Sequence, residues 1–167
     1  MKKTIYILIT VLVILFITFF VANINVVNLK NKNTDTNLKI YETTCGKYEK
    51  RKLEISGKEL LVDIADNECK MSLGLSWKAS LIDEGMLVVF ENVGNYSFWM
   101  KDMNFPIDIL WINENLDVVG IEKNLSPDTF PKSFGSNYLV KYVLEVPAQY
   151  SDKNNIKTGD KIVFTTK

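Results

Sequence analysis

The hydrophobic pattern divides the chain into an apolar N-terminal run, a short polar segment and a body with period-two alternation. In residues 5–22, fourteen of the eighteen positions are Ile, Leu, Val or Phe, and no charged residue occurs from 4 to 29. A run of this length and composition is typical of a membrane-spanning helix. We therefore expect a transmembrane anchor over residues 1–29 that contacts the lipid bilayer through residues 5–27.

The charges that flank this run predict its orientation. Lys2 and Lys3 precede it, and the positive-inside rule keeps such residues in the cytoplasm. The sequence thus predicts a single-pass protein of the cell membrane with an extracytoplasmic C-terminal domain. The alternative is a cleaved signal peptide and a secreted product. Phe20 stands where a cut after Ala22 would need a small residue, which favours an uncleaved signal-anchor.

The polar segment 30–52 reads as a tether because its apolar residues are too sparse for a helical or strand period. Residues 30–58 hold eight basic and four acidic residues, whereas 59–167 hold ten basic and sixteen acidic residues. The chain has two cysteines, Cys45 and Cys69. A disulfide between them would stabilise the fold by about 3 kcal/mol in the loop-entropy model, but Cys69 could equally be a small buried hydrophobe.

Residues 53–167 show the alternation of short strands separated by turns. A hairpin is expected around Ser56-Gly57, followed by a short helix over 67–73 that Asp66 caps and Gly74 closes. Further strands are expected at 86–90, 96–100, 107–112, 116–121, 138–146 and 161–165, with a second short helix near 148–155. The pattern predicts a mainly β domain, an antiparallel sandwich or partly open barrel with two short helices.

Composition narrows the chemistry. The chain has no histidine, and its 20 basic residues balance its 20 acidic ones. Histidine-based catalysis and histidine zinc sites are therefore excluded, and bulk electrostatic binding of nucleic acid is not expected. The sequence contains no phosphate-binding loop, dinucleotide fingerprint or zinc spacing. We accordingly expect no cofactor and no metal.

The segment 96–108 concentrates the residues suited to binding. If Trp99 and Trp111 emerge with Trp77 on one surface, beside Lys101, they would form an aromatic platform for sugar rings, peptides or cations. The alternative is that these aromatic rings fill the interior. From this segment we predict a binding or accessory module for a peptide, glycan, envelope or membrane-protein partner.

Carboxylates suggest a second function. Asp108 lies in an otherwise apolar strand, so it must be paired or hydrogen-bonded if buried. Lys101 and Lys78 are candidate partners. Together with Glu84, Asp108 could supply the two carboxylates of a hydrolase that acts on envelope polymers. A structural ion pair is the competing interpretation.

The body also resembles a known family, the domain of unknown function 192. The likeness runs in order along nearly all of residues 60–165, and its segments are GLSWKASL at 74–81, EGML at 84–87, FWMK at 98–101, PIDI at 106–109, YVLEV at 142–146 and GD at 159–160. The resemblance implies a compact, mainly β domain, often secreted or membrane-anchored, without an established reaction. Three positions depart from the family pattern: Ser76 replaces Met, Lys78 replaces Arg and Gln149 replaces Gly. Lys78 cannot form the two parallel hydrogen bonds to a carboxylate that an arginine forms.

Overall fold

The computed structural model describes residues 11–26, 36, 39, 43–81 and 84–165. Its secondary structure is dominated by short strands. In chain order the elements are β1 (Glu49–Ile55), β2 (Lys58–Ala65), α2 (Glu68–Leu73), β3 (Glu84–Gly94), β4 (Ser97–Trp99), β5 (Ile107–Ile112), β6 (Val118–Leu125), the 3-10 helix η1 (Pro127–Thr129), β7 (Ser133–Gly135), β8 (Val140–Pro147), α3 (Tyr150–Lys153) and β9 (Ile162–Phe164).

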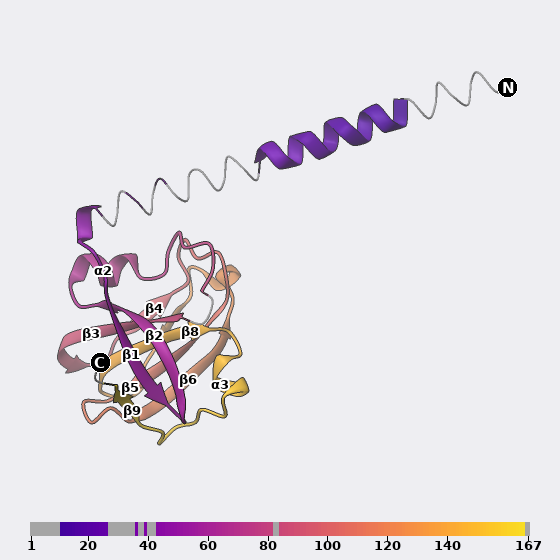
Figure 1. The fold of residues 1–167 in the computed structure, drawn as a ribbon. Helices are drawn as coiled ribbons and strands as arrows, with labels where there is room; N and C mark the ends of the chain where they lie inside the picture. Colours follow the sequence, from indigo (N-terminus) through magenta and orange to yellow (C-terminus); the bar gives the residue numbers. More distant parts are fainter. Residues whose placement is uncertain (1–10, 27–35, 37–38, 40–42, 82–83, 166–167) are drawn as a thin grey trace.

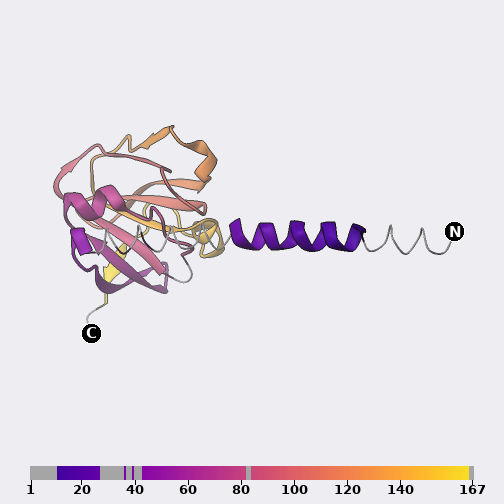
Figure 2. The same cartoon turned by 90° about the horizontal axis from the view of Figure 1, so that it is seen from above.

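Seven strands form one sheet in the order β6-β5-β8-β3-β2-β1-β9, and β4 pairs separately with β7. The neighbours in the large sheet run antiparallel, except β2 and β3, which are parallel. A parallel pair needs a crossover connection, and the segment that contains α2 supplies it. Figures 1 and 2 show α2 and α3 on different sides of this sheet.

The large sheet curls until its two edge strands meet at one end. Asp117, just before β6, forms an isolated bridge with Lys161, just before β9. The backbone N–H of Ile162 also donates to the carbonyl of Leu116 at 2.9 Å. The sheet is therefore a half-barrel whose edges touch at one end (Figure 1). This half-barrel confirms the predicted mainly β class. Of the two architectures predicted, it corresponds to the partly open barrel, and the sandwich is wrong.

Each face of the curled sheet carries its own hydrophobic core. The first core lies on the inside of the curl and includes Leu53, Val62, Leu87 and Leu144. The second core covers the opposite face, where Met86, Val88, Ile109, Trp111 and Val143 meet residues of α2, β4 and β7. Because side chains alternate along each strand, the two cores draw on alternate positions of the same strands. This second face carries the site described below.

Most predicted elements are present with shifted bounds. The hairpin of β1 and β2 turns at Ser56 and Gly57, both with positive φ. The helix α2 ends at Gly74 as predicted, but its N-cap is Asn67. The Asn67 side chain accepts a hydrogen bond from the backbone N–H of Lys70 at 2.9 Å. Asp66 instead pairs with the Lys70 ammonium. The structure also begins its first strand at Glu49, inside the segment predicted as tether.

The predicted membrane anchor requires correction. Residues 11–26 are helical. No helix within the described ranges is long and apolar enough to cross a membrane. This finding overturns the predicted single-pass, cell-membrane localisation. The bilayer contact of residues 5–27 stays a prediction. Residues 1–10 and 27–29 of the predicted anchor lie outside the described residues.

A disulfide ties the segment before β1 to α2. Cys45 and Cys69 are bonded, with 5.3 Å between their Cα atoms and a sequence separation of 24. Cys69 lies in the first turn of α2. Because α2 is only six residues long, it depends on tertiary contacts for its stability. The disulfide therefore fixes the position of a helix that forms part of the candidate site.

Candidate functional site

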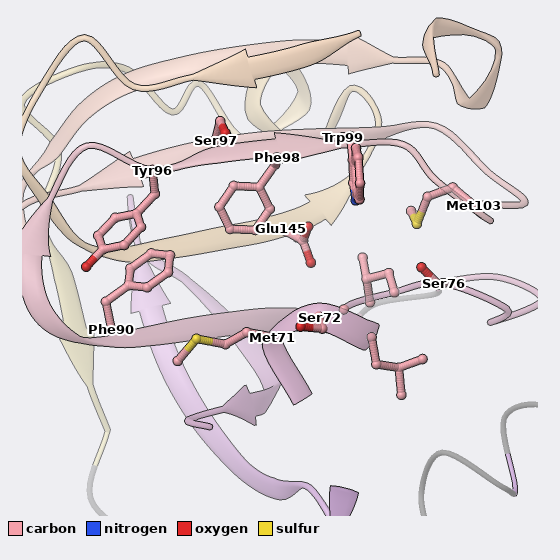
Figure 3. A pocket seen from close by; sticks show the side chains of 13 residues that line it. Met71, Ser72, Ser76, Phe90, Tyr96, Ser97, Phe98, Trp99, Met103 and Glu145 are labelled. Atoms are coloured by element: carbon pink, nitrogen blue, oxygen red, sulfur yellow. The ribbon is translucent and has the colours of Figure 1, made fainter. Parts of the chain in front are cut away.

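A groove opens between α2 and β4 on the second face of the sheet. Its cavity volume is about 340 Å³. Figure 3 shows Tyr96, Phe98 and Trp99 above, Phe90 and Met71 below, and the carboxylate of Glu145 between them. We call this cavity the α2–β4 groove; its lining is Met71, Ser72, Leu73, Gly74, Leu75, Ser76, Phe90, Tyr96, Ser97, Phe98, Trp99, Met103 and Glu145.

Strand register places the carboxylate of Glu145 on the floor of the groove. On β8, Glu145 is the Cα partner of Met86 on β3 and of Ile109 on β5. Met86 in turn is aligned with Asp63 on β2, and Asp63 with Lys50 on β1. Partners in a ladder point to the same face of a sheet, so these five side chains form one row across the second face.

Glu145 is the least satisfied polar group of this row. It is only 6% exposed, and no described residue donates a hydrogen bond to its Oε2 atom. Burial disfavours the charged carboxylate and raises the pKa of Glu145 to about 7, although the positive charge of Lys78 works in the opposite direction. A carboxyl group that titrates near neutrality in a cavity is typical of functional sites.

Beside Glu145, two lysines share one aspartate. The Lys78 ammonium lies 2.7 Å from Oδ2 of Asp63, and the Lys50 ammonium lies 3.2 Å from its Oδ1. Lys50 also binds Glu84 at 3.0 Å. Burial lowers the pKa of Lys50, but its bonds to Glu84 and Asp63 outweigh this effect and raise it above 10.5. Two ammonium groups thus hold the two oxygens of Asp63 in this chain.

The groove continues into a second cavity of about 330 Å³ at the Trp77 end. Trp77, Trp99 and Lys101 all line this cavity, together with Asp102. The backbone N–H of Trp77 donates to the carbonyl of Asp102 at 2.9 Å, and the Ser76 hydroxyl donates to the carbonyl of Lys101 at 2.9 Å. These bonds tie the two sides of the cavity to each other. The structure therefore brings together Trp77, Trp99 and Lys101, but not Trp111, of the residues predicted for the binding platform.

The aromatic side chains differ in what they offer a ligand. Trp99 is 54% exposed, and its ring lies beside the ring of Phe130 and under the Lys101 ammonium. Phe90 and Tyr96 stack on each other with 3.5 Å between ring centroids. Trp111, which we had considered for the platform, is instead 2% exposed in the second core. Trp99 is therefore the most accessible of these rings.

The structure does not place Asp108 and Glu84 as the predicted hydrolase requires. Asp108 is fully buried, and its carboxylate accepts hydrogen bonds from the backbone N–H groups of Asn124, Gln149 and Ser151 at 2.9, 3.1 and 3.0 Å. These bonds, and not the predicted contacts with Lys101 or Lys78, satisfy its charge. Asp108 is aligned with Val146, so it points away from the face of Glu84 and Glu145. Asp108 and Glu84 therefore cannot flank one scissile bond.

The sequence interpretation missed Glu145 and Asp63. Both signals were present, because each is an acidic residue inside an apolar, alternating segment, at YVLEV and LLVDIA. The same reasoning that singled out Asp108 applies to them. Within the described ranges, no group of three or more Cys, Asp or Glu side chains is arranged to hold a metal ion.

Comparison with known proteins identifies the family of the chain. A solved structure from Sinorhizobium meliloti 1021, described as a candidate transcription regulator, is 27% identical with a TM-score of 0.67; the match covers 70% of this chain and 95% of that one. A protein of unknown function from Novosphingobium aromaticivorans DSM 12444 is 21% identical with a TM-score of 0.63, over 70% and 84% of the two chains, and shows the shared fold. No curated protein matches. The model of DUF192, described as "Uncharacterized ACR", matches residues 51–164, and the chain therefore belongs to the DUF192 family.

Proposed function

We propose that the chain is a non-enzymatic binding module that holds a peptide segment in the α2–β4 groove and its Trp77 end. The observation that carries this proposal is that Trp77, Trp99 and Lys101 line the cavity at the Trp77 end, and that Trp99 also lines the α2–β4 groove. Volumes of about 340 and 330 Å³ lie at the small end of ligand pockets. Such cavities suit one or two side chains of a peptide that runs across the surface.

The lining favours a peptide over a glycan. Met71 and Met103 line the groove, and methionine adapts to irregular apolar side chains. Sugar rings instead need accessible aromatic faces, but Phe90 and Tyr96 cover each other. The groove therefore offers apolar walls with few flat faces for a sugar.

Nucleic acid is not a proposed ligand. Residues 59–167 carry ten basic and sixteen acidic residues, and an excess of acid repels a phosphate backbone. The description of the Sinorhizobium protein as a candidate regulator applies to that protein.

The proposal is tested with peptide and glycan arrays probed with the wild-type chain and Trp99→Ala. Tyr138→Ala is the matched control, because Tyr138 is 53% exposed, similar to Trp99, and lies outside the lining of both cavities. We expect wild type and Tyr138→Ala to bind the same peptides and Trp99→Ala to lose them. Identical profiles for all three chains would refute the role of the groove, and binding to glycans alone would replace the peptide with a sugar.

A further inference from the structure

The floor of the α2–β4 groove carries one carboxylate more than its surroundings neutralise. Asp63 and Glu84 are each in contact with a lysine, and Lys50 and Lys78 are the two cations of this network. With Glu145 ionised, the five groups carry two positive and three negative charges. Glu145 is the member without an ion pair within the described part of the chain.

The other charged groups around the groove do not supply the missing cation. On α2, the Lys70 ammonium pairs with Asp66 at 2.8 Å. At the Trp77 end, Lys101 lies over the Trp99 ring and is accompanied by Asp102. The neighbour of Glu145 on β5 is the apolar Ile109, and Glu122 on β6 beyond it adds a negative charge. Tyr96 adds a phenol to the lining.

A buried carboxylate is costly without a partner. Glu145 also has a cavity in front of it, since its side chain lines the groove among aromatic rings (Figure 3). An ammonium group in this cavity would form charge-assisted hydrogen bonds with Glu145. The rings of Tyr96, Phe98 and Trp99 would add favourable contacts with the cation or its apolar stem.

We propose that the α2–β4 groove recognises an ammonium group on an apolar stem, with the carboxylate of Glu145 as its ion-pair partner. This inference rests on the proposed peptide-binding function and names the chemistry of the peptide group that is bound. Two parts of a peptide carry this chemistry, a lysine side chain and a free amino terminus. Both supply three N–H donors, which matches a buried acceptor that lacks a donor.

Four small probes distinguish these sources in a binding titration followed by calorimetry. Nα-acetyl-lysine amide presents the side-chain ammonium, and phenylalanine amide presents the terminal one; the Nε-acetylated and Nα-acetylated forms of the two are neutral controls. The titration uses the 167-residue chain at pH 7, where an α-amino group, with an ordinary pKa of about 7.7–8.0, is mostly an ammonium. We expect one ammonium probe to bind about tenfold or more tightly than its acetylated form.

Glu145→Gln keeps the shape of the side chain and removes its charge, so it should abolish this preference. Glu91→Gln is the matched control, because Glu91 is an exposed residue of β3 that does not line the groove. Acidification from pH 7 to 5 should weaken binding of the ammonium probe by up to about tenfold for each pH unit, because Glu145 becomes protonated.

The outcomes separate this inference from the proposed function. Equal binding of charged and acetylated probes, weakened by Trp99→Ala, would overturn the ammonium inference and leave the groove as a binding site. A charge preference that survives in Glu145→Gln would also overturn it. If none of the four probes binds while array peptides still bind in a Trp99-dependent manner, the inference is again refuted. Arrays without Trp99-dependent peptides would refute the proposed function itself.

Discussion

Glu145→Gln should make the protein more stable at neutral pH, and by an amount that depends on pH. The carboxyl has an ordinary pKa of 4.5, which burial raises to about 7 in the folded chain. Because the folded state then binds more protons than the unfolded state between these values, the free energy of unfolding falls as pH rises through this interval. A difference of about 2.5 pKa units corresponds to about 3 kcal/mol.

The substitution removes this dependence because glutamine does not titrate. Near pH 4.5 both side chains are neutral and of similar shape, so wild type and Glu145→Gln should be about equally stable. At pH 8 the wild type holds a buried charge, and we expect Glu145→Gln to unfold about 10 °C higher. The chain has no histidine, the side chain that ordinarily titrates between pH 5 and 8.

The assay is thermal unfolding followed by circular dichroism at half-unit steps from pH 4.5 to 8. Glu91→Gln, on the exposed side of β3, should follow the wild-type curve throughout. A difference between Glu145→Gln and wild type that stays constant with pH would refute the reasoning. A stability difference that grows as the pH falls would be opposite to the expected dependence and would also refute the reasoning.

Three further substitutions test the rest of the fold. Asp108→Ala should destabilise the chain by at least about 3 kcal/mol in urea unfolding, because it leaves three backbone N–H groups without their acceptor; a loss below 1 kcal/mol would contradict this role. Replacing both Cys45 and Cys69 by serine should cost about 3 kcal/mol, and no loss would show that the 24-position closure contributes nothing. Gln149→Gly should raise stability by about 0.5–1 kcal/mol, because Gln149 has a φ of +67°, and a decrease would show that its side chain matters more than its backbone.

The sequence predicted the local elements well because they depend on local rules. The period-two pattern and the Ser56-Gly57 turn are enough to define the hairpin of β1 and β2. The unusual Gln149, which departs from the family's glycine, lies at a left-handed position that glycine adopts without strain. Such features need no knowledge of distant contacts.

What the sequence did not predict depends on contacts between distant segments. The parallel pairing of β2 with β3 joins strands across an 18-residue connection, and the alternation of apolar and polar residues does not show in which direction a strand runs. The roles of Asp108 and Glu145 look alike in sequence, since both are acids in apolar strands. Only the register of β5 on β8, which aligns Asp108 with Val146 and Ile109 with Glu145, separates them onto opposite faces.

The apolar N-terminal run shows a different limit. Hydropathy measures composition alone, and fourteen apolar positions of eighteen favoured an anchor. No helix in the described part of the chain is long and apolar enough to cross a bilayer. Composition alone was therefore not enough to predict a membrane-spanning helix.

The most direct test of the account is a map of the binding surface by two-dimensional amide NMR, with the best peptide from the array added to the isotopically labelled chain. The account predicts that the largest shifts fall on the indole N–H of Trp99 and on the amides of Leu73, Ser76 and Phe98, which line the α2–β4 groove. Shifts concentrated on β1 and β9, with the groove unchanged, would contradict it.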